Sequence, residues 1–477
     1  MMAQSKQIQF LKGSTILIIS NLVIKGINFF LLPLYTKYLT PEALGVSDTI
    51  VSLTSMIFPL LVMGLDSAFS AFYFDERSEE HQKRVFNTIC CTLMLVSIIP
   101  IVFILFSQII SVFLFNTDKY DILVSIAFLS VSMNLWYLPF SIIVRMKNKM
   151  LLFAIVNFIA SISMIGLNIV FLSVVHLGVY SLILTTAIIN LLQFCLYLKF
   201  SGSKIEKTFF NKKLIQKMLK YSLPLVPNVV ALWILNMSDR YIILYFCGEG
   251  DVGLYGIAAR FATMVSFIAN GVYMSYTTYV YDKKDDADAP KQYARILNAF
   301  NLIILIICII GSIFGKEVIG IMTDEAYYES YLMLAPLLFS QLLYGINTIV
   351  GYAIGFAKKS YYTLLSTSVG AIINVILNII FIPKFGAVAA AYTTCVSFAI
   401  MVVITYLISQ KLYYVEYGIK KMTIIIICTF VISVFVKDIN IVMKIIFAVI
   451  VIISLLLSYK KIVMDCIIII KRILNRR

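Results

Sequence analysis

The chain has 477 residues, of which 61% are hydrophobic and only 13% charged, and its mean hydropathy is +0.96. This composition excludes a water-soluble globular protein, because soluble domains keep a large polar surface. The net charge of +15 does not indicate a nucleic-acid-binding protein, since the basic residues follow the membrane-topology pattern described below.

Apolar runs of about 20 residues, the length of a helix that crosses a bilayer, recur along the whole chain. They predict an all-α integral membrane protein with about fourteen transmembrane helices. The predicted spans are 14–36, 43–65, 88–110, 122–144, 151–173, 179–199, 221–247, 254–280, 296–315, 331–356, 362–382, 387–409, 423–436 and 441–458.

Lys and Arg are distributed unevenly between the alternate loops. With a cytoplasmic N-terminus, thirty of the 39 basic residues fall on the inside, six outside or at outer span ends, and three within spans. Because basic residues are enriched in cytoplasmic loops, both termini are predicted to be cytoplasmic.

An internal repeat occurs at an offset near 210 residues. The segment 167–172 (LNIVFL) recurs as 377–382 (LNIIFI), and each copy follows a short basic loop. Six spans per repeat predict two bundles related by a pseudo-twofold axis along the membrane normal. The predicted division is an N-terminal six-helix bundle (1–200), a cytoplasmic linker (201–220), a C-terminal six-helix bundle (221–409), and two additional helices with a basic cytoplasmic tail (410–477).

Polar residues interrupt the first two spans of each half. They are Asn21, Lys25 and Asn28 on the first span, Asp48, Ser52 and Ser55 on the second, Asn236, Asp239 and Arg240 on the seventh, and Arg260, Thr263 and Asn270 on the eighth. Within the seventh span, Pro224 and Pro227 remove two backbone donors and predict a partly broken helix.

Charges within a bilayer are costly and usually have a function. Lys25, Arg240 and Arg260 outnumber Asp48 and Asp239, so we expect one polar cavity between the halves that suits an anionic group such as a phosphate. A carboxylate that alternates between paired and protonated states could couple transport to protons or sodium, with Asp48 the first candidate and Asp239 the second. The alternative is that these charges only pair with one another and hold helices together.

Apart from a transported proton or sodium ion, no cofactor is expected. Eight cysteines form no CxxC pair, and His81 and His176 lie in different loops, which argues against a metal site. There is no GxxxxGK[ST] loop, so the chain is not expected to hydrolyse nucleotide or to be an enzyme. Gly351 and Gly355 form a GxxxG pattern, typical of a helix–helix contact.

The segments 32–50 (LPLYTKYLTPEALGVSDTI), 222–228 (SLPLVPN), 233–244 (WILNMSDRYIIL) and 250–261 (GDVGLYGIAARF) resemble the polysaccharide (Wzx-type) flippases of the multidrug/oligosaccharidyl-lipid/polysaccharide (MOP) exporter superfamily. The resemblance covers nearly the whole chain. It implies a V-shaped, MATE-like pair of six-helix bundles that alternates between inward-open and outward-open states. It also implies an oligosaccharide repeat unit on undecaprenyl pyrophosphate as substrate, for lipopolysaccharide, capsule or another glycan. By this resemblance, the substrate moves from the inner to the outer leaflet of the bacterial cytoplasmic membrane.

By the same resemblance, cationic residues on spans one, two, seven and eight bind the pyrophosphate; the matching positions are Lys25 and Arg260, with Arg240 a weaker match. Span two carries Asp48 in place of a cation. The implied partners are membrane lipids, a polysaccharide polymerase and a chain-length regulator, and no nucleic acid.

Two other functions stay open. A cation-coupled multidrug antiporter of the same fold would favour an acidic cavity rather than one with surplus basic residues. A membrane-embedded polysaccharide polymerase or glycosyltransferase usually needs a sizeable outer loop, whereas the longest one predicted here is 316–330.

Overall fold

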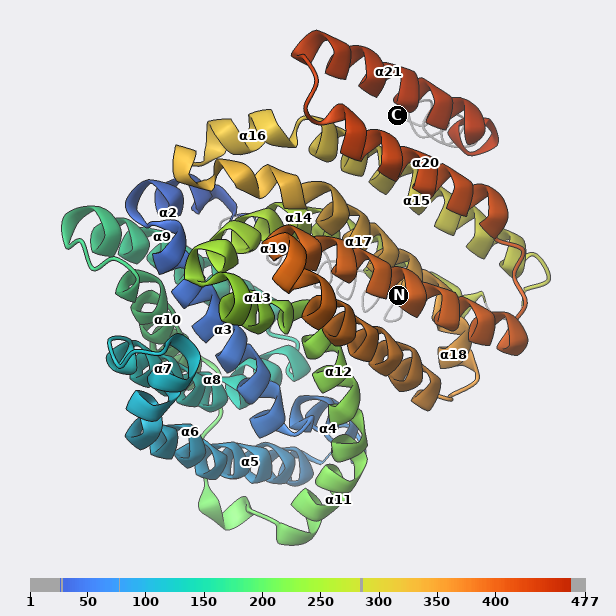
Figure 1. The fold of residues 1–477 in the computed structure, drawn as a ribbon. Coiled ribbons are helices and arrows are strands. Elements are labelled where there is room, and N and C mark those ends of the chain that lie inside the picture. Colours follow the sequence, from blue (N-terminus) through green and yellow to red (C-terminus); the bar gives the residue numbers. More distant parts are fainter. Residues whose placement is uncertain (1–25, 27–28, 77, 284–285, 465–477) are drawn as a thin grey trace, which may run out of the picture. The chain divides into compact units, whose positions relative to one another are not determined.

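The structure is a computed structural model that describes residues 26, 29–76, 78–283 and 286–464. Within these ranges the chain consists of helices and short connections without a strand, which confirms the predicted all-α class (Figure 1). The chain divides into two compact units, residues 1–233 and 234–477, and each is described by itself. The predicted four-part division and the V shape stay predictions.

The helices of the first unit begin at the end of the first predicted span. They are α2 (Leu32–Tyr38), α3 (Pro41–Val62), α4 (Leu65–Phe72), α5 (Glu79–Val96), α6 (Ile98–Phe103), η1 (Ile104–Phe106), α7 (Ser107–Phe115), α8 (Asp121–Met146), α9 (Met150–Ile169), η2 (Val170–Val174), α10 (Tyr180–Phe200), η3 (Lys207–Phe209), α11 (Lys212–Ser222), η4 (Leu223–Leu225) and α12 (Val226–Met237), whose last turn belongs to the second unit.

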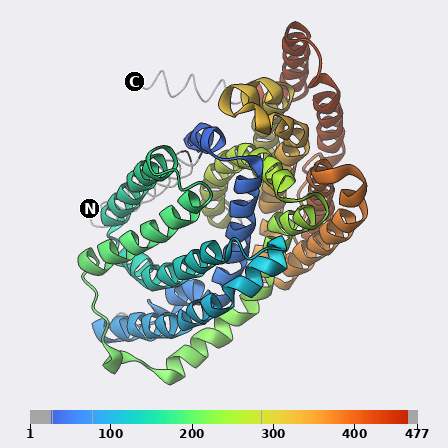
Figure 2. The ribbon, with the colours of Figure 1, turned by 60° about the vertical axis from the view of Figure 1, so that its left-hand side comes forward.

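The second unit contains both short helices and the two longest described ones, α14 (Glu249–Asp282) and α19 (Tyr361–Leu412). In chain order, its helices are α13 (Asp239–Cys247), α14, α15 (Ala289–Ile313), α16 (Gly315–Met322), η5 (Glu325–Ser330), α17 (Tyr331–Val350), α18 (Tyr352–Phe356), α19, α20 (Ile419–Val436) and α21 (Ile441–Ser458). Figures 1 and 2 both show α20 and α21 as a hairpin beside α15.

Twelve helical segments in the described ranges are long and apolar enough to cross a membrane. One of them, α19, has 52 residues and is broken at Gly386. The φ of 66° and ψ of −162° at this residue lie in a backbone region that essentially only glycine adopts. Its halves match the predicted spans 362–382 and 387–409, so thirteen of the fourteen predicted spans are present. The remaining span, 14–36, lies mostly outside the described residues.

The seventh predicted span, 221–247, is broken twice. Pro224 lies in the short 3₁₀ helix η4, and Ser238 interrupts the chain between α12 and α13. The partly broken helix predicted from the two prolines is therefore present, and its second break falls directly before Asp239.

The joint between α3 and α4 in the first unit requires a glycine. Gly64 has a φ of 69°, and a Cβ there would lie 2.9 Å from the carbonyl oxygen of Ser222 at the end of α11. The Ser222 hydroxyl donates a hydrogen bond to the carbonyl of Met63 at 2.7 Å. This contact holds α11 against the joint.

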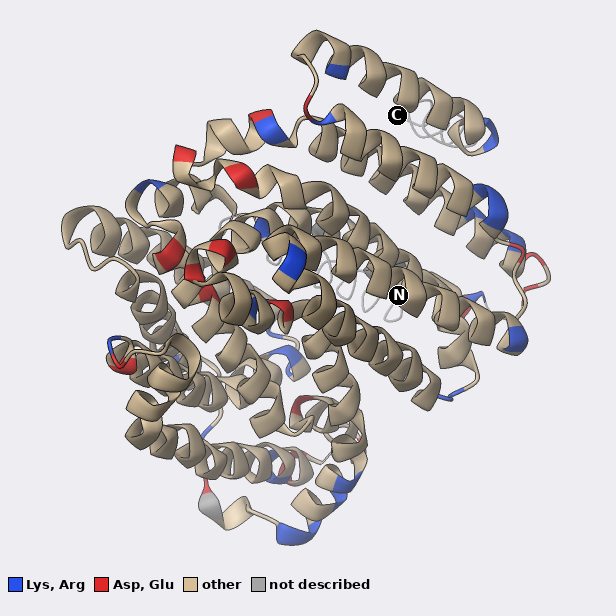
Figure 3. Ribbon diagram, viewed as in Figure 1, with Lys and Arg blue, Asp and Glu red and all other residues tan. Residues whose placement is uncertain are grey.

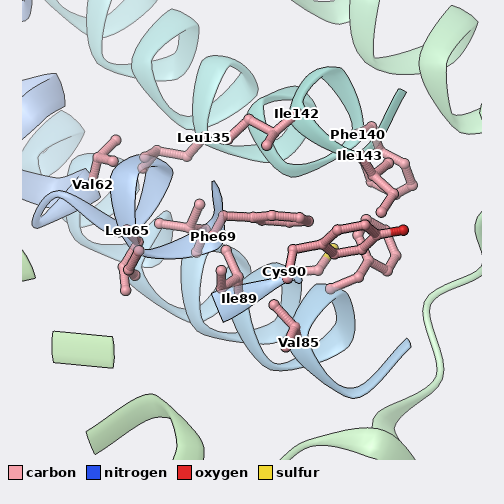
Figure 4. Close-up of a cluster of buried hydrophobic side chains, with 14 of the residues drawn as sticks. Val62, Leu65, Phe69, Val85, Ile89, Cys90, Leu135, Phe140, Ile142 and Ile143 are labelled. Carbon is pink, nitrogen blue, oxygen red and sulfur yellow. The ribbon is translucent and has the colours of Figure 1, made fainter. Parts of the chain in front are cut away.

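Apolar side chains of α3, α4, α5 and α8 fill the core of the first unit (Figure 4). Phe69 packs edge-to-face on Phe86 with ring centroids 6.5 Å apart, and Phe86 packs on Phe140 at 5.3 Å. In the second unit, Leu235 packs with Ala371, Phe398 and Met401 of α19.

The segment that follows α10 is tied to the first unit. The backbone amide of Glu206 donates to Oδ1 of Asn87 at 2.6 Å, and that of Asn211 donates to the hydroxyl of Thr88 at 3.1 Å. Lys149 donates to the carbonyl of Ser201 at 3.0 Å. Residues 201–211 are thus an ordered part of the first unit.

Charged residues gather toward helix ends, and the long helices are otherwise largely uncharged (Figure 3). In the second unit, residues that the topology prediction places on the same side of the membrane are in contact. Glu317 and Lys444, both predicted to be at the outer side, form an ion pair of 2.7 Å, whereas Asn301 donates to the hydroxyl of Tyr459 at the predicted inner side. Which end faces the cytoplasm stays a prediction.

Candidate functional site

Asp239 and Arg240 form a buried ion pair at the start of α13. The Asp239 side chain is 1% exposed, and its Oδ1 accepts hydrogen bonds from the Arg240 backbone amide at 2.9 Å and from Nη1 of Arg240 at 3.3 Å. The same Nη1 donates to the carbonyl of Asn236 at 3.1 Å, and the guanidinium lies 5.7 Å from the centre of the Tyr255 ring. Three predicted site residues, Asn236, Asp239 and Arg240, are therefore together.

A chain of polar side chains continues from Asp239 into the interior of the second unit. The hydroxyl of Tyr255 on α14 donates to Oδ2 of Asp239 and has Thr394 of α19 as a further hydrogen-bonding neighbour. Nδ2 of Asn374 donates to the hydroxyl of Thr394 at 3.2 Å, and Nδ2 of Asn378 donates to Oδ1 of Asn374 at 3.0 Å. We call Asp239, Arg240, Tyr255, Asn374, Asn378 and Thr394 the Asp239 network.

The Asp239 network joins α13, α14 and both halves of α19, because Asn374 precedes Gly386 and Thr394 follows it. Buried polar groups in a hydrocarbon environment need partners, and these side chains supply them for one another. The ion pair alone has the contacts that a purely structural role requires. The amides and hydroxyls behind it add further hydrogen-bonding groups within the interior of the second unit.

Metal ligation by the usual side chains is not found in the part of the chain that the structure describes, where no three His, Cys, Asp or Glu residues lie close together. Hard cations bind oxygen ligands instead. The Asp239 network contains such oxygens in the carboxylate of Asp239, the hydroxyl of Thr394 and the amides of Asn374 and Asn378. The carboxylate of Asp239 is already paired with the guanidinium of Arg240, so a proton or small cation bound there would compete with this ion pair.

In the first unit, the predicted polar stripe of the second span is one face of α3. Asp48 and Ser52 are buried, and Ser55 is partly buried. Nε1 of Trp233 donates to the carbonyl of Ser52 at 3.2 Å and to the hydroxyl of Ser55 at 3.0 Å. Part of this face therefore binds the second half of α12 through Trp233.

Arg260 is half-buried on α14, and the hydroxyl of Thr263 donates back to its carbonyl at 2.8 Å. Asn270 lies on the same helix, with a side chain outside the described part of the structure. Asn21, Lys25 and Asn28 also lie outside the described residues. The role of every predicted site residue, and the cavity expected between the halves, stay predictions.

Sequence reasoning missed four members of the Asp239 network: Tyr255, Asn374, Asn378 and Thr394. Asn378 was noticed only as part of the repeated segment 377–382. Two of the four carried a usable signal, because Asn374 and Asn378 are four residues apart and so share a helix face. The stripe search that found Asp48 would have found these two, but not Tyr255 or Thr394.

Comparison with protein families gives two matches. A model described as polysaccharide biosynthesis protein matches residues 10–278, more than half of the chain. A second model, MatE, matches residues 224–380.

Two archaeal relatives differ in how much of the chain they cover. The uncharacterized membrane protein MJ1068 of Methanocaldococcus jannaschii is 23% identical over 460 residues, which are 90% of each chain. A probable low-salt glycan biosynthesis flippase of Haloferax volcanii, Agl15, is 24% identical over 209 residues, which are 43% of this chain and 44% of the relative.

Solved structures share the fold. A lipid II flippase MurJ in an inward closed conformation has a TM-score of 0.76 and 17% identity, and the match covers 93% of this chain and 99% of that one. A multidrug resistance MATE family transporter of the MOP superfamily, in an inward-facing conformation, has a TM-score of 0.65 and 14% identity, covering 85% and 99%.

Proposed function

Because the chain belongs to the polysaccharide biosynthesis protein family, we propose that it carries lipid-linked glycans across a membrane by alternating access. The resemblance to MOP-superfamily polysaccharide flippases is confirmed at the level of the family, and the chain is a multi-pass membrane protein. The proposed substrate is an oligosaccharide repeat unit on undecaprenyl pyrophosphate, moved from the inner to the outer leaflet. The two relatives described above are archaeal and give no support for a bacterial membrane. The bacterial plasma membrane is therefore a part of our proposal that rests on the sequence resemblance.

The observation that carries the proposal is the Asp239 network inside segments of membrane-spanning length. Ionisable groups in such segments are costly and mark paths for ions or substrates. The network exceeds what an isolated ion pair needs, since it extends through two asparagines and a threonine to both halves of α19. It supports a transporter in which a buried carboxylate responds to an ion.

The substrate-binding residues we propose divide by chemistry. Lys25, Arg260 and Arg240 would bind the pyrophosphate, because cationic side chains form charge-assisted hydrogen bonds with phosphate oxygens. Amide side chains suit sugar hydroxyls, since an amide both donates and accepts. The proposed amides are Asn21, Asn28, Asn236 and Asn270.

Asp48 and Asp239 are the proposed ion-coupling residues, with H⁺ or Na⁺ as the transported ion. Asp239→Asn keeps the shape of the side chain but removes its charge. We expect the variant to bind substrate while losing the dependence of transport on an ion gradient. Unchanged gradient dependence in this variant, and in Asp48→Asn, would assign coupling to other residues.

Purified protein in liposomes tests the transport proposal. A polyprenyl-pyrophosphate-linked oligosaccharide carrying a fluorophore is placed in both leaflets, and a membrane-impermeant quencher reports its movement. Arg260→Ala should slow movement strongly, Arg260→Lys should keep part of it, and Lys411→Ala, which removes an exposed cation at the end of α19, should have no effect. Absence of movement in the unmodified protein, with the fold intact, would refute the proposal.

A multidrug antiporter is the second candidate, favoured by the MatE match over residues 224–380 and by the MATE-like fold. The same liposomes distinguish the two. An antiporter would move a fluorescent organic cation against an imposed ion gradient and leave the lipid-linked glycan in place.

A further inference from the structure

Aromatic side chains form a continuous cluster at the end of the second unit that is predicted to face the cytoplasm. Tyr352 of α18 is at its centre, with its ring centroid 5.0 Å from that of Tyr276 and 5.9 Å from those of Tyr273 and Tyr281. Phe356 extends the cluster, 5.5 Å from Tyr281.

Burial divides this cluster into a base and an exposed edge. Tyr276 is 3% exposed, and the buried Tyr293 beneath it donates its hydroxyl to the carbonyl of Val280 at 2.9 Å. Tyr273 and Tyr281 are 39% and 48% exposed. The two accessible phenol rings thus pack on the partly buried ring of Tyr352, which in turn packs on the buried Tyr276.

Gly355 explains how Tyr281 reaches its position. A Cβ at Gly355 would lie 2.7 Å from the Tyr281 hydroxyl, so any larger residue requires Tyr281 to shift from this position. The hydroxyls of Thr277 and Tyr352 share a hydrogen bond, which fixes the central ring. The Gly351–Gly355 pattern was expected to mark a helix–helix contact. Its second glycine, Gly355, also leaves space for the side chain of Tyr281.

The exposed side of α14 differs from a lipid-facing surface. Thr263, Ser266, Tyr273, Thr277 and Tyr281 fall within a sector of about 80° at 3.6 residues per turn, over a length of about 27 Å. Tyr273 and Tyr281 are the large hydrophobic side chains exposed on the described part of α14, whereas α21 exposes isoleucine, valine, leucine and methionine along its length. A face of this kind suits water and hydroxyl groups better than acyl chains.

We propose that Tyr273 and Tyr281, seated on Tyr352 and Gly355, form a stacking platform for the sugar rings of the transported glycan at the entry side. The inference rests on the proposed glycan transport and adds an aromatic subsite for the sugar rings, which neither the cationic residues nor the proposed amides supply. The C–H face of a sugar ring is apolar and packs against the electron-rich face of a phenol ring. The phenol hydroxyls can donate to and accept from the sugar hydroxyls around it.

The competing interpretation is an interfacial aromatic belt, in which tyrosines anchor helices at the lipid headgroups. Tyr414, just beyond α19, is 71% exposed and serves as a matched control for that role. A belt residue should affect insertion and stability without regard to the substrate. A stacking residue should affect transport in proportion to the carbohydrate carried.

Liposome transport of two probes tests the platform: polyprenyl pyrophosphate linked to a single sugar, and the same carrier linked to a pentasaccharide. Tyr273→Ala and Tyr281→Ala should each slow pentasaccharide transport about tenfold relative to the single-sugar probe, a ratio equivalent to roughly 1.4 kcal/mol. Tyr414→Ala should leave the ratio unchanged. Equal slowing of both probes, or no slowing, overturns the platform, whereas failure of the unmodified protein to move either probe refutes the proposed function instead.

Gly355→Ala tests the seat without removing a tyrosine. The added methyl group should displace Tyr281 and reproduce the loss of pentasaccharide transport. Adding Tyr281→Phe removes the hydroxyl that the methyl group meets, so the double variant should regain most of the activity. A double variant as impaired as Gly355→Ala, with the same amount of folded protein, contradicts the assignment.

Discussion

Replacement of Gly64 by alanine should destabilise the first unit in two separable ways. The left-handed φ of 69° costs a residue with a Cβ roughly 1–2 kcal/mol. The new Cβ would also lie 2.9 Å from the Ser222 carbonyl oxygen and 3.1 Å from its Cβ. Because these atoms belong to backbone and a short side chain, they cannot swing aside, and overpacking of this kind costs about 1–3 kcal/mol.

Gly418 provides the control. It has the same φ of 69°, but a Cβ there meets no atom within 4 Å, so Gly418→Ala carries the conformational cost alone. The gain from a stiffer unfolded chain is similar in both variants and cancels. We therefore expect Gly64→Ala to be less stable than Gly418→Ala by about 1–3 kcal/mol.

Equilibrium unfolding in mixed detergent micelles with increasing SDS measures this difference, followed by the loss of helical circular dichroism. Loss of the contact between α11 and the α3–α4 joint should also speed proteolysis in α11. Equal stability of the two alanine variants would refute the argument that Ser222 crowds the joint.

Three further predictions concern contacts described above. Glu317→Ala leaves the buried Lys444 amine without its ion-pair partner and should lower the unfolding free energy by about 3 kcal/mol. Lys444→Met leaves a carboxylate that is 34% exposed and should lower it by about 1 kcal/mol in the same unfolding assay. A larger loss in Lys444→Met than in Glu317→Ala would contradict the argument from burial. Asn87→Ala removes the acceptor of the Glu206 amide and should accelerate tryptic cleavage after Lys204, with Asn157→Ala on α9 as a control that leaves cleavage unchanged. Tyr255→Phe removes a donor to Asp239 and should lower the unfolding free energy by about 1–3 kcal/mol, and a neutral result would show that another donor replaces the hydroxyl.

The positions and breaks of the helices could be predicted where local hydropathy, proline and glycine determine them. The second to fourteenth spans follow from hydropathy, and the break in α19 follows from Pro383 and Gly386 between two apolar runs. The broken seventh span follows from Pro224 and Pro227. In these places local chemistry determines the backbone without help from distant residues.

Side-chain partners were less predictable, because they depend on which helix faces meet. Asp239 and Arg240 were recognised as candidates, but their link through Tyr255 to Thr394 and Asn374 joins residues more than a hundred positions apart. The segment 201–211 looked like a connection by composition. Its attachment depends on Asn87 and Thr88, which read as ordinary polar residues near the start of a span.

The attachment of the chain to the first unit continues beyond this segment. Ser222 is bonded to the α3–α4 joint and Trp233 to α3, so the first unit holds the chain almost to its own boundary. In the second unit, α12 ends at Met237, and Ser238 separates it from α13 directly before Asp239. A small rotation of α13 about this break would therefore alter the hydrogen bond between Asp239 and Tyr255 of α14 without unfolding either helix.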